Sequence, residues 1–175
     1  NDPKINDEEF LPSGTKQYTS EVYRDKLNNL STVISQLGMD DSPDGLAILG
    51  VAEVENRKVL EDLAAMPKLK ERDWKIVHYD SPDLRGVDVA LYYHPKYFRE
   101  LKSEPLFVPL KGDDGSLWYT RDILYVYGLF QGEPLHIFVG HWPSRRGGEE
   151  ASAPGRSVPE ISPFPVTRTV SWTPP

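Results

Sequence analysis

A nearly continuous apolar run, Leu46–Val54, constrains the fold most, and Glu53 is its only charged residue. Runs of this kind are typical of strands that are buried on both faces of a sheet. Asn56 follows at once and can cap a helix that ends at the residue before Pro67. The sequence therefore predicts a buried strand with a carboxylate near its C-terminal end, followed directly by a helix. The apolar positions of that helix are Val59, Leu60, Leu63 and Met66.

An amphipathic helix is also predicted before this strand. Thr19 or Ser20 can cap its N-terminus, and Gly38 supplies the residue that ends it. Its apolar residues recur at three- and four-residue steps, so we expect one face of the helix to be buried. These residues are Tyr23, Leu27, Leu30, Val33, Ile34 and Leu37.

The rest of the chain has the pattern of consecutive strands. The first two, residues 74–79 and 87–93, are joined by a loop rich in turn-forming residues and are predicted to form a long hairpin. Helices before and between the early strands, followed by strands alone, favour an α+β fold. In such a fold, helices pack on a face of a mixed, mostly antiparallel sheet. The remaining strands are predicted at residues 106–110, 118–119, 123–130 and 135–139.

Composition excludes several classes of protein. The 175 residues contain no Cys, which excludes disulfides and thiolate metal sites. With 20 Lys and Arg against 27 Asp and Glu, the net charge is −7, so a broad basic surface for nucleic acid is not expected. No apolar stretch approaches the roughly 18 residues of a membrane helix. Because the net charge is negative, any phosphate site must be local. The Walker loop, dinucleotide fingerprint, nucleophile elbow and zinc-helix motifs are also missing, which excludes the enzyme classes that carry them.

Glu53 is the strongest candidate functional residue. A carboxylate at the C-terminal end of a buried strand points toward the crevice in which sheet proteins hold ligands. The alternative interpretation is a solvated strand end, or a salt bridge between Glu53 and Arg57 or Lys58. Position alone does not separate the two interpretations.

His141 ends an apolar run and opens a loop that contains Ser144, Arg145, a second Arg and two Gly. Arg guanidinium groups suit phosphate oxygens, and Gly lets backbone N–H groups approach an anion. The alternative is an ordinary basic surface loop with a histidine at its base. The other histidines lack such neighbours, so we expect structural or solvent-exposed roles for His78, His94 and His136.

Two further arginines lie near carboxylates in the sequence. Arg121 precedes Asp122 at the start of a strongly β-forming run, and Arg85 stands in a turn near Asp88. Each is either a phosphate-binding group or a surface arginine in an exposed ion pair, which contributes at most about 1 kcal/mol. Both interpretations stay open on local features.

Four segments point to a family when they are taken together: Leu49-Gly-Val-Ala-Glu-Val-Glu-Asn56, Arg85-Gly-Val-Asp-Val-Ala-Leu-Tyr-Tyr93, Thr120-Arg-Asp122 and Val139-Gly-His-Trp-Pro-Ser-Arg145. In this order they resemble the endonuclease/exonuclease/phosphatase superfamily, the deoxyribonuclease-I-like group. The segment Asn6-Asp-Glu-Glu-Phe-Leu-Pro12 also resembles its members, and the likeness covers about residues 1–156. The resemblance implies part of a four-layer α/β-sandwich.

The resemblance also implies roles for particular residues. Glu53 matches the family's metal-binding glutamate, and the metal implied is Mg²⁺ or Mn²⁺. His141 matches a histidine that hydrogen-bonds a nonbridging oxygen of the scissile phosphate, and Arg121 matches an arginine near that phosphate. The implied reaction is metal-assisted hydrolysis of a phosphoester by in-line attack of water. The residues expected to contact the substrate are Ser144, Arg145, Arg85 and Asp88.

The chain departs from the family in lacking an Asn on a first strand, a Gly-Asp-x-Asn motif and a terminal Asp-His pair. We therefore expect residues 1–155 to form a partial domain, truncated at both ends. Residues 156–175 contain five Pro and are expected to form an irregular tail. Without the Asp-His pair the attacking water lacks its general base, so we expect little or no activity from this chain alone. The alternative function is a noncatalytic phosphate-binding module of the same fold.

For either function the expected partner is a phosphoester, and nucleic acid, phospholipid headgroups and small phosphate esters all stay open. The sequence predicts neither a membrane span nor an obligate protein partner, and it leaves the cellular location open. We expect Glu53 and His141 to lie at neighbouring strand ends of one sheet. We also expect Mg²⁺ or Mn²⁺ to bind weakly through Glu53, with a dissociation constant of roughly millimolar or worse.

Overall fold

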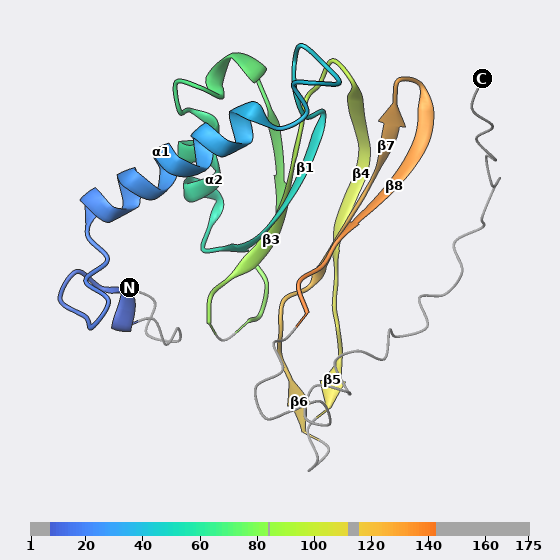
Figure 1. Cartoon of the computed structure of the whole chain (residues 1–175). Coiled ribbons are helices and arrows are strands. Elements are labelled where there is room, and N and C mark those ends of the chain that lie inside the picture. The colour runs from blue at the N-terminus through green and yellow to red at the C-terminus, as the bar shows by residue number, and fades with distance from the viewer. Residues whose placement is uncertain (1–7, 84, 112–115, 143–175) are drawn as a thin grey trace. The chain divides into compact units, whose positions relative to one another are not determined.

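The computed structural model describes residues 8–83, 85–111 and 116–142, and Figure 1 shows how their helices and strands are arranged. Ser144, Arg145 and the predicted tail lie outside the described residues. Within these ranges, no helix is long and apolar enough to span a membrane. The elements are η1 (Glu8–Phe10), α1 (Ser20–Gln36), β1 (Ile48–Val54), α2 (Arg57–Ala64), η2 (Lys70–Arg72), β2 (Lys75–His78), β3 (Asp88–Tyr93), β4 (Phe98–Leu106), β5 (Leu110–Lys111), β6 (Leu117–Trp118), β7 (Ile123–Phe130) and β8 (Glu133–Val139).

Both predicted helices form with their predicted caps. The Thr19 hydroxyl accepts a hydrogen bond from a backbone N–H of the first turn of α1 at 3.4 Å, and Gly38, with a φ of +72°, follows the end of that helix. The Asn56 side chain accepts from a backbone N–H of the first turn of α2 at 3.1 Å. α2 ends at Ala64, two residues earlier than predicted, because the Met66 N–H bonds three residues back and tightens the last turn.

The strands β1, β3 and β2 form an antiparallel sheet in that order, which confirms the predicted hairpin of β2 and β3. The central strand is β3, and its residues Asp88–Tyr92 are all buried. The prediction that β1 is buried on both faces is wrong, because Ala52 and Glu53 are exposed. Among the described strands β1 pairs with β3 alone, so it keeps the solvent contact of an edge strand.

The strands β4, β7 and β8 form a second antiparallel sheet. β7 spans the predicted residues 123–130, and β8 begins two residues before the predicted start at 135. The sequence pattern finds only the last residue of β4, because charged side chains break up its apolar pattern. The predicted strand at 106–110 is therefore wrong: its two ends belong to β4 and β5.

Two apolar clusters hold the layers together. One joins the helices to the sheet of β1, β3 and β2, and contains Leu60 and Tyr92. The other joins the two sheets and contains Leu91, Phe98 and Val126, all buried. The helices, the first sheet and the second sheet are therefore three successive layers (Figure 1). This arrangement confirms the predicted α+β class, and every described strand pair is antiparallel.

Candidate functional site

Glu53 lies in a β-bulge near the end of β1. Ala52 pairs with Val89 and Val54 pairs with Asp88, so Glu53 is left out of the ladder with β3. Its φ of +58° is in the left-handed region, which costs a non-glycine residue about 1–2 kcal/mol. Bulges redirect side chains, and strained backbone is concentrated at functional positions. The side chain of Glu53 is 61% exposed and therefore accessible to a ligand.

Glu53 and His141 are in contact although they are 88 residues apart. The His141 Nε2 atom lies 3.2 Å from the Glu53 Oε1 atom, and the His141 side chain is 36% exposed. The prediction that one sheet carries both residues is wrong, because β1 and β8 belong to different sheets. The two sheets pack face to face, and a side chain at Gly50 would touch Val139. Packing between the sheets therefore brings the two groups together.

The basic residues that follow Glu53 have other partners. Arg57 pairs with Glu61 at 3.0 Å, and Lys58 pairs with Asp62. Both pairs span one turn of α2. The alternative of a salt bridge between Glu53 and Arg57 or Lys58 is therefore wrong. Among the described residues, the His141 ring is the hydrogen-bond partner of the Glu53 carboxylate.

Arg121 is buried, with 3% of its surface exposed. Its Nη1 donates to Asp83 Oδ2 at 2.9 Å, and its Nε donates to the carbonyl oxygen of His141 at 3.1 Å. The alternative of an exposed surface ion pair is therefore wrong, and the acidic partner is Asp83 rather than Asp122. Arg121 links the loop between β2 and β3 to His141, two residues after the end of β8, and so fixes the backbone of His141.

The sequence pattern does not single out Asp83, which accepts from two arginines. The exposed guanidinium of Arg85 lies 3.5 Å from Asp83 Oδ1, and the Arg85 backbone N–H donates to the same oxygen at 2.8 Å. Arg85 therefore pairs with Asp83 and not with Asp88. The sequence signal for this pairing is a Pro-Asp-x-Arg turn between two strands, because an Asp side chain in such a turn accepts from the backbone two residues on.

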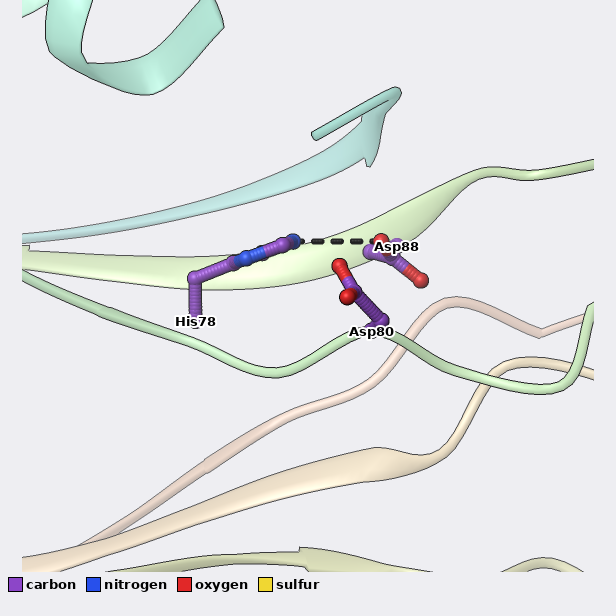
Figure 2. Close-up of side chains that lie close together, drawn as sticks. All are labelled: His78, Asp80 and Asp88. Carbon is purple, nitrogen blue, oxygen red and sulfur yellow. Dashed lines mark hydrogen bonds and ion pairs between the residues drawn. The ribbon is translucent and has the colours of Figure 1, made fainter. Parts of the chain in front are cut away.

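Asp88 is buried beside His78, a residue for which the sequence predicts a structural or solvent-exposed role. Asp88 Oδ2 lies 3.1 Å from His78 Nε2, and Asp88 Oδ1 accepts from the Ser81 N–H at 2.9 Å. Asp80 turns its carboxylate toward the same point, and the ligand atoms of His78, Asp80 and Asp88 all lie within 4.8 Å of one another (Figure 2). Sequence reasoning missed this group, although a His-x-Asp spacing at a strand end puts both side chains on one face of an extended chain.

Asp122 adds a further carboxylate to this part of the molecule. Its Oδ1 atom is buried and has no hydrogen-bond partner among the described residues. Burial, and then the negative charge of Asp88, raise the pKa of the Asp122 carboxyl above its usual value. Among the described residues, neither Asp88 nor Asp122 pairs with a Lys or Arg, although Asp88 is bonded to His78. Two carboxylates without such a counter-charge favour the approach of a cation.

The exposed pair of Glu53 and His141 fits a divalent metal and a phosphate. Carboxylate oxygens are the ligands that Mg²⁺ and Mn²⁺ prefer, and Glu53 offers them at the surface. An imidazole N–H donates well to an anionic oxygen. The bond to Glu53 is consistent with a proton on His141 Nε2, which is the form that can donate to a phosphate.

Residues 1–162 match the sequence profile of the endonuclease/exonuclease/phosphatase family. The match spans Glu53, Arg121 and His141. No curated protein matches the chain. The two antiparallel sheets and the helices beside them agree with the deoxyribonuclease-I-like fold. Because the matched segment makes up most of the sequence, the chain belongs to the endonuclease/exonuclease/phosphatase family.

Proposed function

We propose that this protein is a phosphoester hydrolase that depends on Mg²⁺ or Mn²⁺, with Glu53 and His141 at its centre. Members of the family hydrolyse phosphoester bonds. The observation that supports the proposal most is the 3.2 Å contact between two exposed groups that come from different sheets. An exposed ion pair adds little stability, so stability alone does not account for a strained Glu53 facing a histidine.

Glu53 is the proposed ligand of the metal. The bulge presents its carboxylate to solvent, and its partner within the described residues is one imidazole, which can give way to a metal ion. A bound divalent ion would polarise the phosphoryl oxygen and lower the pKa of a bound water. The carboxylate of Glu53 would hold that ion beside the His141 ring.

His141 is the proposed donor to the phosphate. Its ring N–H would donate to a nonbridging oxygen, where negative charge grows in the transition state. Such a donor is effective when it is fixed before the reaction, and Arg121 fixes it through the His141 carbonyl oxygen. We therefore assign Arg121 a positioning role, through its buried pair with Asp83.

Arg85 is the proposed substrate contact within the described residues. Its side chain is 57% exposed, and the long 3.5 Å contact with Asp83 leaves it free to reach a phosphate oxygen. Ser144 and Arg145 stay proposed substrate contacts on the strength of their sequence motif. Asp88 is buried and bonded to His78, so its oxygens are better suited to a cation than to the substrate.

The alternative function is a noncatalytic module that binds phosphate esters. One observation favours it: the buried pair of His78 and Asp88, with side chains 3% and 6% exposed, is poorly placed to take a proton from a water in an open site. Loss of a general base typically costs about 10²–10⁴ in rate. Binding without turnover is the property that separates the module from the enzyme.

The test uses the full chain with bis(4-nitrophenyl) phosphate as a diester and 4-nitrophenyl phosphate as a monoester. The hydrolase predicts release of 4-nitrophenolate that is slow, because the Asp-His pair of the family is missing from the sequence, that needs Mg²⁺ or Mn²⁺, and that falls in Glu53→Gln and in His141→Gln. The exposed Glu55 provides the control, and Glu55→Gln should keep the wild-type rate. Metal-dependent binding of both esters without release would support the module. Release of 4-nitrophenolate, or binding of the esters, that does not depend on the metal and is unchanged by both substitutions would overturn both functions.

A further inference from the structure

We infer that His78, Asp80 and Asp88 form a second divalent-cation site, distinct from Glu53, that takes a transition-metal ion such as Mn²⁺ or Zn²⁺. The inference rests on the group itself and does not depend on the proposed hydrolase. Figure 2 shows the His78 ring pointing at Asp88, with the Asp80 carboxylate reaching toward the same place. The group combines one imidazole nitrogen with carboxylates from a strand and from the loop that follows β2.

The spacing of the ligand atoms fits one ion. Donors about 2.0–2.2 Å from a metal lie roughly 3–4.4 Å from one another, depending on the coordination geometry. The ligand atoms of His78, Asp80 and Asp88 all lie within 4.8 Å of one another, so a small movement of the exposed Asp80 would let all three coordinate one ion. The backbone N–H of Ser81 already holds Asp88 Oδ1, which is the kind of outer contact that orients a metal ligand.

In the part of the chain that the structure describes, His78 is the basic partner of this group of carboxylates, through its contact with Asp88. Among the described residues, no Lys or Arg pairs with Asp80, Asp88 or Asp122, whereas Asp83 in the same loop pairs with two arginines. Asp122 also has a buried oxygen for which the described residues provide no hydrogen-bond partner. Like charges this close are unfavourable in a partly buried place, and a cation removes the penalty.

The donor set selects the kind of ion. Mg²⁺ prefers oxygen ligands and octahedral geometry, whereas an imidazole nitrogen suits Mn²⁺ and Zn²⁺. His78 and Asp88 are buried but Asp80 is exposed, so the ion can approach from the side of Asp80. Coordination would replace the contact between His78 and Asp88, and His78 Nε2 would then carry no proton.

An ion at this site would stiffen the neighbouring hydrolase residues. Asp88 pairs with Val54, the residue after the Glu53 bulge. Asp80 lies in the loop that also carries Asp83, the partner of Arg121. The site would therefore fix both the bulge of Glu53 and the anchor of His141, and it would protect the folded chain against unfolding.

The experiment is a Mn²⁺ titration of the full chain, followed by electron paramagnetic resonance with detection of nitrogen coupling to the bound ion. Wild type should bind Mn²⁺ with one coupled imidazole nitrogen. Asp80→Asn should weaken this binding at least tenfold, while the control Asp73→Asn, an exposed carboxylate paired with Lys75, should leave it unchanged. Mg²⁺ should compete at least tenfold more weakly than Zn²⁺.

The histidine variants identify the site. The nitrogen coupling should vanish in His78→Gln and persist in His141→Gln and in Glu53→Gln. If His78→Gln does not fold, Asp80→Asn decides the outcome, because Asp80 is exposed and its loss should leave the fold intact. Unchanged binding in Asp80→Asn, or coupling that is lost in His141→Gln instead, would overturn the inference. If the nitrogen coupling to Mn²⁺ persists and ester binding is unchanged in Glu53→Gln, the proposed function is overturned and the second site is not.

Discussion

The buried pair of Arg121 and Asp83 should be the ion pair on which this fold depends most. Their side chains are 2% and 6% exposed, so water replaces neither group well when its partner is removed. Arg121→Met keeps an apolar chain of similar length and leaves the Asp83 carboxylate without its buried counter-charge. Removing one partner of a buried pair costs about 3–5 kcal/mol.

The other contacts of Asp83 and Arg121 narrow this range of free-energy costs. Asp83 Oδ1 keeps the backbone N–H of Arg85 at 2.8 Å, which lowers the cost, whereas the bond from Arg121 Nε to the His141 carbonyl oxygen is lost. A hydrogen bond of this kind contributes about 1 kcal/mol. We therefore expect Arg121→Met to lower the free energy of unfolding by about 3–4 kcal/mol, a large part of the roughly 5–15 kcal/mol of a typical domain.

Arg85→Met is the matched control, because Arg85 contacts the same carboxylate from the exposed side at 3.5 Å. It should cost at most about 1 kcal/mol. The assay is urea unfolding followed by tryptophan fluorescence, which reports on the buried Trp74. The double variant Asp83→Leu with Arg121→Met should recover part of the loss, since no charge is left unpaired. Equal losses for the two arginines, or a loss below about 1 kcal/mol for Arg121→Met, would refute this reasoning.

Three further predictions concern strain and protonation. Glu53→Gly should raise the free energy of unfolding by about 1 kcal/mol in urea unfolding, because glycine adopts the left-handed backbone without strain; an unchanged midpoint would show that the bulge is unstrained. Burial and the hydrogen bond to Asp62 raise the pKa of Tyr23 to about 12. The stabilising contribution of Tyr23 is therefore fully present below pH 10 and is lost as the pH rises toward 12. Between pH 8 and pH 11, the free energy of unfolding should therefore fall less in Tyr23→Phe than in the wild-type chain. The raised pKa of Asp122 means that its ionised form is disfavoured in the fold. Asp122→Asn should therefore raise the free energy of unfolding of the metal-free chain at pH 7 and lose that advantage at low pH. A difference between variant and wild type that is the same at both pH values would contradict this.

Local signals in the sequence were sufficient for the elements that depend on local chemistry. The caps at Thr19 and Asn56 and the stop at Gly38 were predicted because each acts on the nearest turn of its own helix. β7 was found because its residues are largely apolar and β-forming. β4 was not predicted because its charged residues interrupt the apolar pattern, and two of them, Arg99 and Glu100, are adjacent.

Contacts between residues that are far apart in the sequence account for the features that no local pattern predicted. The contact between Glu53 and His141 depends on two sheets packing face to face, and no local pattern distinguishes this from pairing within one sheet. The burial of Arg121 depends on Asp83, a loop residue that lies 38 positions earlier in the chain. The sequence does not reveal the contact of His78, because its partner Asp88 is ten residues away, across the hairpin.

The most direct test of the account is a calorimetric titration of Mg²⁺ into the full chain, because Mg²⁺ favours the oxygen ligand Glu53 over the imidazole-containing group of His78. Mg²⁺ should bind weakly, with a dissociation constant of roughly millimolar or larger, and this binding should be abolished in Glu53→Gln and unchanged in Glu55→Gln. Binding that survives Glu53→Gln, or micromolar binding in wild type, would contradict this expectation and would place the metal of this protein elsewhere.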